Sequence, residues 1–249
     1  MRERPTEPIA EETLDSILGG ALRLYQPRRG YRFSVEAVLL ARFAAARPAA
    51  RVLELGAGCG VVALIVAACV RPREVVAVEI QPVLAALIKR NAALNGLRMV
   101  RAVCADLRSR RALGAASGAF DLVLANPPFR ARASGRESPQ AGRRLARGES
   151  AARLEDFTAA AARYARHGGR AAFVFAAARS AELISALRAR SLEPKRIRFV
   201  HPNAAASAST VLVEARRGGG VEVEVEPPLV MYRAPGVYSE EARALLERL

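Results

Sequence analysis

From Arg51 onward, short apolar runs rich in Val, Leu and Ile alternate with longer segments of helical character. The apolar runs are 51–55, 74–80, 98–104 and 120–125. Uninterrupted runs of this kind are typical of strands that are buried on both faces of a sheet. Helices are expected between them, over 60–69 and over 82–95, where Pro82 suits a first helical turn. The alternation predicts an α/β fold, a mostly parallel, Rossmann-like sheet with helices on both faces.

Beyond residue 150 the alternation continues and then breaks down. The expected helices are 154–166 and 180–190, and the expected strands are 170–175, 196–200 and 210–215. The last two strands have no helix between them, which predicts an antiparallel edge of the sheet. The segment 221–226 alternates Val and Glu, as a half-exposed strand does. A short helix is expected over 239–249.

The segment ahead of Arg51 adds little to the predicted sheet. Residues 1–20 are mixed and acidic, and we interpret them as a loosely held N-terminal arm. Residues 21–50 contain a short alternating strand at 22–26 and a helix to about Ala46, with Ser34 as its N-cap and Glu36 in its first turn. We therefore expect residues 1–249 to form one domain, whose catalytic core is 51–249.

Composition points to the cell compartment and to a class of partner. The first twenty residues contain five acids and no apolar signal region, and the longest apolar run, 61–70, is too short to span a bilayer. Three cysteines without metal-ligand spacing indicate a reduced, cytoplasmic protein without a metal. The net charge of +15 favours a polyanionic partner. A GC-rich genome explains why nearly all of the basic residues are Arg. It does not explain why 39 Lys and Arg residues outnumber 24 Asp and Glu residues.

The strand 120–125 ends in Asn126-Pro127-Pro128-Phe129. Two consecutive prolines cannot donate to a sheet or continue a helix, so they stiffen the backbone where the strand leaves the sheet. The amide of Asn126 offers a carbonyl oxygen and an NH₂ group there, and Phe129 offers a flat face. A rigid amide beside an aromatic ring suits a planar group that carries an amino group. An ordinary strand end is the alternative interpretation, since Asn and Pro are common turn residues.

A second candidate site follows the first predicted strand. Gly56, Gly58 and Gly60 allow the backbone to approach a ligand closely and direct N–H groups into the crevice at the carboxyl ends of the strands. Glu79 ends the next strand, where it could accept hydrogen bonds from ribose hydroxyls, and Asp106 follows the third, where it could hold an adenine amino group. Either acid alone could be a solvated strand end. Their order at successive strand ends favours a nucleoside site.

The spacing of the glycines distinguishes between two nucleoside ligands. A dinucleotide fingerprint requires a glycine where Val61 stands, and here the pattern is Gly-x-Gly-x-Gly with Glu54 two residues ahead. A carboxylate at that position opposes a pyrophosphate but suits the ammonium group of an amino-acid-bearing nucleoside. The expected cofactor is therefore S-adenosyl-L-methionine, with S-adenosyl-L-homocysteine as its product.

These motifs resemble those of the class I S-adenosylmethionine-dependent methyltransferases, and among them the amino-methylating group with an Asn-Pro-Pro-aromatic motif. The bacterial valine-tRNA adenine-N6 methyltransferases are more similar still. Their likeness to this chain extends to Phe33-Ser34, Leu39-Leu40-Ala41, Pro228-Leu229-Val230 and Tyr238-Ser239-Glu240-Glu241. Two departures stand out, because that family usually has Asp where Glu36 stands and related enzymes often have Tyr in place of Phe129.

The resemblance implies roles for particular residues. Asn126, Pro127, Pro128 and Phe129 would be catalytic, with the Asn126 oxygen and the Pro127 carbonyl accepting the two N–H bonds of the adenine amino group. The expected cofactor-binding residues are Ser34, Glu36, Glu54, Gly56, Gly58, Gly60, Glu79, Ile80, Asp106, Leu107 and Asn126. The expected substrate is RNA, most specifically N6 of the tRNA adenosine 3′ to the anticodon, and neither DNA nor a membrane is an expected partner.

Three alternatives share some of these features. Protein glutamine N5-methyltransferases use the same motif, but generally carry a helical substrate domain, for which the residues ahead of Arg51 are too few. An rRNA guanine-N2 methyltransferase is the second alternative. A non-catalytic RNA-binding module would fit the charge but would not require residues 126–129.

The segment 130–150 has no clear periodicity and follows the proline motif directly. Long segments of this kind are usually functional or disordered. The segment contains several arginines, of which Arg130, Arg132, Arg143, Arg144 and Arg147 are the expected RNA-binding residues. We expect a mobile flap that contacts phosphates, or else an insertion whose arginines reflect genome composition.

Overall fold

A single large sheet organises the structure, a computed structural model that describes residues 11–29, 32–114, 116–129 and 152–248. Within those residues the sheet has nine strands, in the order β10-β8-β9-β7-β6-β3-β4-β5, with β11 also paired to β8. The strands are β3 (Arg51–Leu55), β4 (Glu74–Glu79), β5 (Val100–Cys104), β6 (Phe120–Ala125), β7 (Ala165–Ala176), β8 (Leu192–His201), β9 (Thr210–Arg217), β10 (Glu224–Val225) and β11 (Leu229–Val230).

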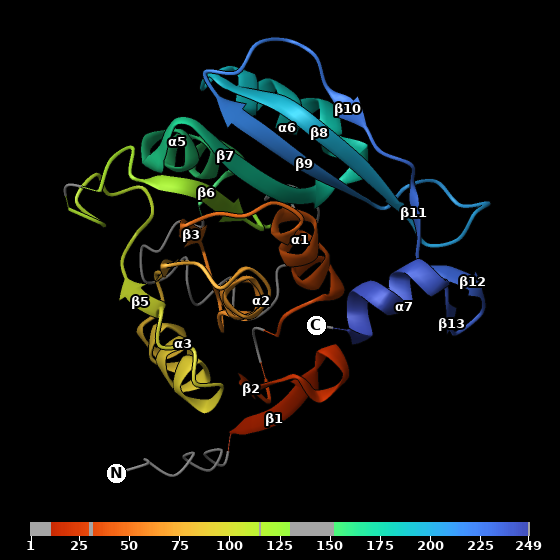
Figure 1. The fold of residues 1–249 in the computed structure, drawn as a ribbon, viewed down its shortest axis with the longest axis horizontal. Helices are drawn as coiled ribbons and strands as arrows, with labels where there is room; N and C mark the ends of the chain where they lie inside the picture. The colour runs from red at the N-terminus through yellow and green to blue at the C-terminus, as the bar shows by residue number, and fades with distance from the viewer. Residues whose placement is uncertain (1–10, 30–31, 115, 130–151, 249) are drawn as a thin grey trace.

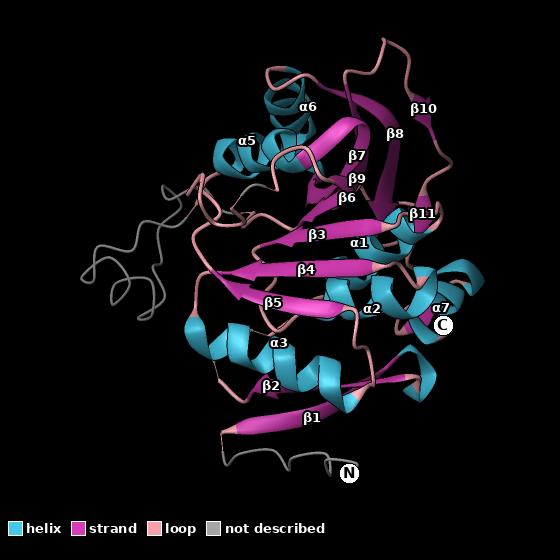
Figure 2. Ribbon diagram, turned by 60° about the vertical axis from the view of Figure 1, so that its left-hand side comes forward, coloured by secondary structure: helices cyan, strands magenta, loops and turns pink. Residues whose placement is uncertain are grey.

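The central strands are parallel and one edge is antiparallel. Strands β7, β6, β3, β4 and β5 all run in the same direction, and Figure 2 shows the arrowheads of β3, β4 and β5 pointing to one side. Strand β9 is antiparallel to both β7 and β8. The predicted fold class, a mostly parallel α/β sheet with an antiparallel edge, is confirmed.

Helices cover both faces of this sheet, as Figure 1 shows. They are α1 (Val35–Ala45), α2 (Val61–Val70), α3 (Pro82–Leu94), α5 (Leu154–Tyr164), α6 (Ser180–Arg188) and α7 (Glu240–Glu247). Alternate strand residues serve different faces: Val52 packs in the cluster of α1, α2 and α3, whereas Leu53 packs in the cluster of α5 and α6. The central strands are therefore mostly apolar on both faces, with few charged residues such as Glu54 among them.

A separate hairpin lies against α3. Strand β1 (Glu12–Ile17) pairs antiparallel with β2 (Leu22–Pro27) through a 3-10 turn over Leu18–Gly20. The Asn91 amide accepts from Tyr25 N (2.7 Å) and donates to Tyr25 O (3.1 Å), while the Asn95 amide accepts from Arg23 N (2.9 Å) and donates to Arg23 O. The expected loosely held arm is therefore wrong for residues 12–17, which pair with β2 and whose side chains from Thr13 to Ile17 alternate between half-buried and exposed, as in a strand.

Other predicted boundaries also change. The helix expected over 154–166 ends at Tyr164, and β7 starts at Ala165 because that residue pairs with Phe120 of β6. Alanine has the highest helix propensity, so the alanines of this region favour helix where the chain has already changed to strand. In the alternating segment 221–226, strand geometry is limited to Glu224 and Val225, which pair parallel with β8.

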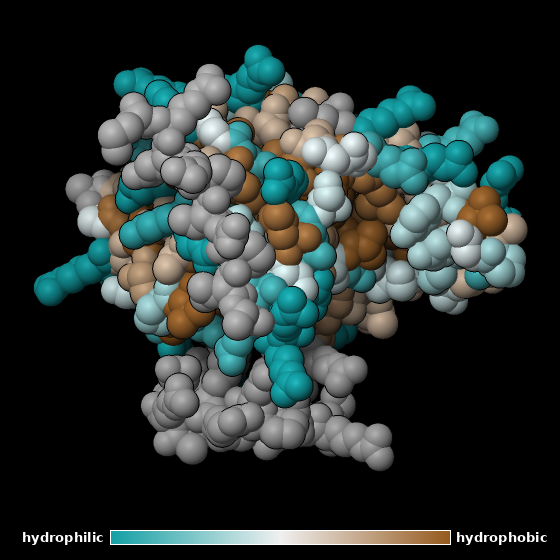
Figure 3. Space-filling model, turned by 90° about the horizontal axis from the view of Figure 1, so that it is seen from below, coloured by the Kyte–Doolittle hydropathy of each residue, from teal (hydrophilic) through white to brown (hydrophobic). Residues whose placement is uncertain are grey.

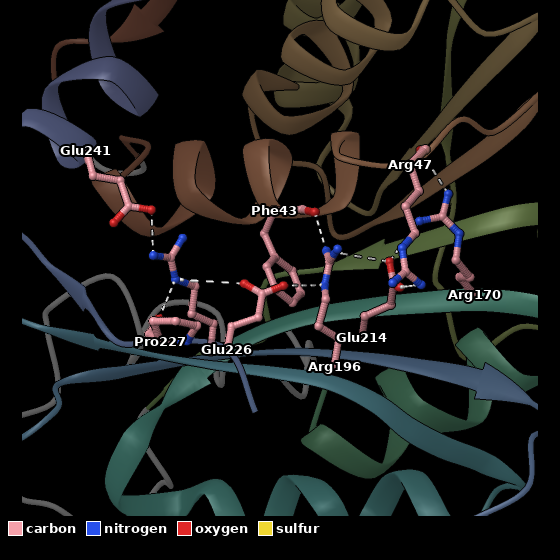
Figure 4. A network of polar contacts seen from close by, with 9 residues as sticks. Phe43, Arg47, Arg170, Arg196, Glu214, Glu226, Pro227 and Glu241 are labelled. Carbon is pink, nitrogen blue, oxygen red and sulfur yellow. Dashed lines mark hydrogen bonds and ion pairs between the residues drawn. The ribbon is translucent and has the colours of Figure 1, made fainter. Parts of the chain in front are cut away.

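Buried charges join the antiparallel edge of the sheet to the helices around it (Figure 4). Glu214 of β9 is fully buried and forms ion pairs with Arg170 (2.8 Å) and Arg47 (3.4 Å), while Arg196 lies 3.9 Å away. Arg196 also lies 3.1 Å from Glu226 and stacks on the Phe43 ring. Because the charges alternate in sign, each one is balanced by a neighbour in a region of low dielectric constant.

The surface is mixed in character. Figure 3 shows hydrophobic patches interspersed with hydrophilic ones on the face seen from below. No helix in the described part of the chain is both long and apolar enough to cross a membrane. Beyond the sheet, a short hairpin of β12 (Tyr232–Ala234) and β13 (Val237–Tyr238) leads into α7. Ser239 is the N-cap of that helix, and its hydroxyl accepts from Ala242 N at 3.1 Å.

Candidate active site

Parallel strands bring the predicted site residues to one edge of the sheet. The loop Gly56–Gly60 follows β3, Glu79 ends β4, Asp106 follows β5, and Asn126 follows β6. Since β6, β3, β4 and β5 are neighbours in that order, their carboxyl ends form one continuous row. Crevices at this edge are where open α/β sheets bind ligands.

Packing explains two of the three glycines in the loop. All three have positive φ, from +57° to +88°. A Cβ on Gly56 would lie 3.1 Å from the Phe157 ring of α5, and one on Gly60 would lie 3.1 Å from Ile88 of α3. The loop is therefore held between two helices from opposite faces of the sheet. Phe157 and Ile88 were not among the predicted site residues, because their apolar side chains look like ordinary core positions in the sequence.

Glu79 fixes the shape of this loop. Its side chain is almost fully buried, and its two oxygens accept from Gly58 N and from Gln81 N, each at 2.9 Å. A carboxylate has about four lone-pair directions, so each oxygen keeps one for a further donor such as a hydroxyl. Glu79 thus joins the glycine loop to the end of β4.

Glu54 lies beneath the loop rather than at its surface. Its side chain is buried on the face covered by α1 and α2, and one oxygen accepts from Ala63 N at 2.8 Å in the first turn of α2. Burial, helped by the nearby charge of Glu79 and opposed by the Ala63 hydrogen bond, raises the pKa of Glu54 to about 8. The carboxyl is therefore largely protonated at pH 7, and a cation placed beside it would favour its ionised form.

The third strand end carries an acid that already has a partner. Arg108 Nη2 lies 2.6 Å from Asp106, and Arg108 Nε donates to both Asp106 oxygens at 3.0 Å. These hydrogen bonds, against a smaller effect of partial burial, hold the pKa of Asp106 below its usual value. Leu107 is buried, and Ile80 is 44% exposed at the neighbouring strand end. This exposed apolar side chain offers a contact for a flat ring.

The proline motif turns away from β6 and is held by a residue from outside it. Asn126 is half-buried, Pro127 is buried and Pro128 is exposed. The half-buried Phe129 ring meets Phe175 edge-on at 5.6 Å, and Arg179 Nη1 donates to Phe129 O at 2.7 Å. The Arg179 guanidinium also lies over the Phe175 ring at 4.6 Å.

Arg179 was not among the predicted site residues. It lies 50 positions from Phe129 in the sequence, at the end of the 3-10 turn Ala177–Arg179, and pairs there with Glu182. No local motif marks it, because the signal is a contact between segments far apart in the sequence.

Two sets of predicted site residues do not belong to this row of strand ends. Ser34 caps α1 by position, but its hydroxyl makes no capping hydrogen bond, and Glu36 is in the first turn of that helix. Helix α1 packs beside α2. The predicted RNA-binding residues Arg130, Arg132, Arg143, Arg144 and Arg147 lie outside the described residues, as does the rest of the expected flap.

Comparison with known proteins adds a family and several similar folds. The profile of a family described as "Methyltransferase small domain" matches residues 35–189, a span that includes every strand end described above. Among curated proteins, the release factor glutamine methyltransferase of Deinococcus radiodurans is 39% identical over 79 residues, which are 32% of this chain and 26% of that protein. The chain thus matches about a quarter of that relative's length.

Solved structures agree on the fold. A protein described as a predicted O-methyltransferase from Agrobacterium tumefaciens superposes with a TM-score of 0.66 at 25% identity, over 84% of this chain and 94% of that one. The 16S rRNA N2 G1207 methyltransferase of T. thermophilus, solved with AdoMet and guanosine, superposes with a TM-score of 0.57 at 21% identity, over 83% and 50%.

Proposed function

The chain belongs to the methyltransferase small domain family and uses S-adenosylmethionine, and from this premise we propose that it methylates the exocyclic amino group of adenine in RNA. The specific target proposed is N6 of the tRNA adenosine 3′ to the anticodon. The observation that carries the proposal is the corner Asn126–Phe129, a rigid amide and an aromatic ring next to the glycine loop along one sheet edge.

The side chains at this edge fit the cofactor. Glu79 keeps lone pairs for ribose hydroxyls, and the exposed Ile80 provides an apolar surface for the adenine ring. Asp106 would accept from the adenine amino group once the Arg108 side chain gives up one of its hydrogen bonds to that carboxylate. Glu54 would ionise beside the ammonium of the methionine part. No cluster of candidate metal ligands occurs within the described residues. When bound, the cofactor supplies an electrophilic methyl group on a sulfonium sulfur.

The protein's own residues would supply orientation. The lone pair of an adenine amino group is delocalised into the ring, which makes the nitrogen a poor nucleophile. We assign Asn126 Oδ1 and the Pro127 carbonyl as acceptors of its two N–H bonds, which draws the lone pair out of conjugation with the ring and directs it toward the sulfonium methyl group. Phe129 would stack on the base, and Pro127 and Pro128 would keep the acceptors fixed. Positioning of this kind can supply much of a rate enhancement.

An adenine must leave its stack to enter such a site, and that costs least in a single-stranded RNA loop. The net charge of +15 favours the same substrate. The second candidate function is transfer to the side-chain amide of a protein glutamine, because the curated relative found is a release factor glutamine methyltransferase. An amide nitrogen also presents two N–H bonds and a delocalised lone pair, so the same corner could hold it.

One assay separates these functions. The protein is incubated with labelled S-adenosylmethionine in three parallel reactions. One contains bulk tRNA that lacks the modification, the second contains ribosomal RNA, and the third contains a release-factor peptide with a glutamine. We expect label in tRNA, recovered as N6-methyladenosine after digestion to nucleosides. Label in N2-methylguanosine, or in the peptide alone, would contradict the proposal.

Replacing Glu79 with Ala is expected to weaken cofactor binding by roughly 1–3 kcal/mol, because ribose hydroxyls lose their acceptor and Gly58 N loses the group that orients it. Calorimetric titration with S-adenosylhomocysteine measures the effect. Glu79→Gln keeps one acceptor oxygen and should lose less. A dissociation constant equal to that of the wild type would show that Glu79 does not contact the cofactor.

Arg179 is expected to act as a positioning residue. Arg179→Ala removes the hydrogen bond to Phe129 O and should lower kcat by about 10- to 100-fold, the cost of a small misplacement near reacting groups. The KM for cofactor should stay constant, and Arg179→Lys should recover part of kcat. Glu182→Gln, which alters the exposed partner of Arg179, is the matched control. An unchanged kcat in Arg179→Ala would rule out this role.

A further inference from the structure

A cavity of about 830 Å³ opens at the edge of the sheet opposite the candidate active site. Its lining includes Ala50, just before β3, Asp121, the second residue of β6, and Gly168 near the start of β7. It also includes Ala215, near the end of the antiparallel strand β9. Apart from Ala215, these positions are at the amino ends of the parallel strands, so the cavity is separate from the row of carboxyl ends that the proposed reaction uses.

The lining of this cavity is strongly basic. Its charged side chains are Arg47, Arg71, Arg73, Arg166, Arg170, Lys195 and Arg216, against Asp121 and Glu214. Cations therefore clearly outnumber anions in the lining. This excess is local, whereas composition alone would distribute arginines over the whole surface.

Both acids in the lining are already paired. Arg166 Nε donates to Asp121 Oδ1 at 2.7 Å, and the other Asp121 oxygen accepts from Arg51 N and Ala50 N. Glu214 is buried between Arg170 and Arg47, as Figure 4 shows. The two carboxylates therefore cannot neutralise the remaining cations.

The other cations have no carboxylate partner within the described residues. Lys195 donates to the backbone oxygens of Val221 and Glu222, and Arg216 donates to that of Gly168. Arg71 and Arg73 are exposed in the turn between α2 and β4. Carbonyl oxygens orient Lys195 and Arg216 without cancelling their charge. The cations converge on the cavity from separate elements, so several anionic groups in a row could be bound at once.

We propose that this basic groove binds the phosphate backbone of the RNA substrate, at a second contact region away from the reacting base. The proposal rests on the proposed RNA substrate. Arginine predominates in the lining, and its planar guanidinium forms paired hydrogen bonds to phosphate oxygens. The lining is concave, which suits a backbone strand better than the flat surface of an anionic membrane.

The distance between the two sites is suited to a folded RNA. Strand β3 has five residues. At about 3.3 Å per residue, its amino end, near the groove, and its carboxyl end, at the candidate active site, lie roughly 17 Å apart. An A-form RNA stem covers that distance within one helical turn. Phosphate contacts fix the register of a nucleic acid without reading its sequence. The groove would therefore orient the whole RNA molecule, while the corner Asn126–Phe129 selects the base.

The test uses Arg71→Gln combined with Arg73→Gln, two exposed side chains outside the candidate active site. Fluorescence titration measures the affinity for bulk tRNA at several salt concentrations, without cofactor. We expect the affinity at low salt to fall about tenfold or more, and the slope of log K against log salt to decrease by about 1 for each cation that contacts a phosphate. Cofactor affinity should not change. Arg233→Gln combined with Arg243→Gln removes the same charge from exposed positions outside the groove and should have little effect.

A second variant, Arg216→Gln, removes a cation from a different element of the groove and should weaken RNA binding in the same way. If both groove variants bind RNA as the control does, the groove is not an RNA site, whatever the reaction. If wild-type protein methylates only the glutamine peptide and binds no RNA, the proposed function fails and the groove proposal fails with it. Equal loss in groove and control variants would show a general charge effect and overturn the groove proposal alone. Binding of anionic vesicles but not RNA would also overturn it.

Discussion

Methyl transfer by Asn126→Ala is expected to fall at least about 10²- to 10³-fold, the range found when one preorganised polar contact to a reacting group is removed. The amide follows β6 directly, between an apolar strand and two prolines, so its immediate neighbours in the sequence offer no polar side group to replace it. Cofactor binding should stay close to that of the wild type, because the glycine loop and Glu79 belong to other strand ends. Single-turnover rates and calorimetry measure the two effects separately.

An isosteric variant sharpens this test. Asn126→Asp keeps an acceptor oxygen of the same size and should retain more activity than Asn126→Ala. If acceptance of the N–H bonds is the role of Asn126, the order of rates is wild type, Asp, Ala. Loss of cofactor binding together with activity in Asn126→Ala would mean that the side chain holds the cofactor, and the assigned catalytic role would be wrong.

Glu214→Gln is expected to lower the free energy of unfolding by about 3–5 kcal/mol, the usual cost of removing one partner from a buried ion pair. The carboxylate is fully buried between Arg170 and Arg196, whose side chains are only 14% and 6% exposed. Without its charge, both guanidinium groups stay buried beside a neutral amide. Urea unfolding followed by circular dichroism measures the change.

A matched acid in the same network provides the control. Glu226 is 22% exposed and pairs with Arg196 and Arg198. Each of these arginines has a second acidic neighbour, Glu214 at 3.9 Å from Arg196 and Glu241 at 2.6 Å from Arg198, so Glu226→Gln leaves neither guanidinium without a carboxylate. Its expected loss of stability is smaller than that of Glu214→Gln. Equal effects from the two substitutions would indicate that burial does not decide the strength of this network.

The fold was predictable where the pattern was local. The strands 51–55 and 120–125 match the structure to the residue, because apolar runs bounded by glycine or proline leave few alternatives. The start of β7 at Ala165 was missed, because its pairing with Phe120 is a contact between distant segments in an alanine-rich stretch. Local propensity is a weak guide when tertiary pairing decides the outcome.

The candidate site shows the same division. The positions of Gly58, Glu79 and Asn126 at the carboxyl ends of neighbouring strands could be predicted, since each occurs at a fixed offset from a strand end. Those of Arg179 and Arg108 could not, because an arginine in an arginine-rich sequence gives no signal until its acceptor is known. The basic groove was beyond sequence analysis for a related reason. Its cations come from separate strands and loops, and only the fold brings them together.

The two amides that attach the N-terminal hairpin to α3 also bear on aggregation. A strand at the edge of a small sheet normally presents unpaired N–H and C=O groups that another molecule can join. In β2, the outward groups of Arg23 and Tyr25 bond to the side chains of Asn95 and Asn91. Helix α3 thus occupies the place of a third strand, and the edge of β2 is closed to recruitment of a foreign one. A helix can protect a sheet edge in this way without contributing any backbone to it.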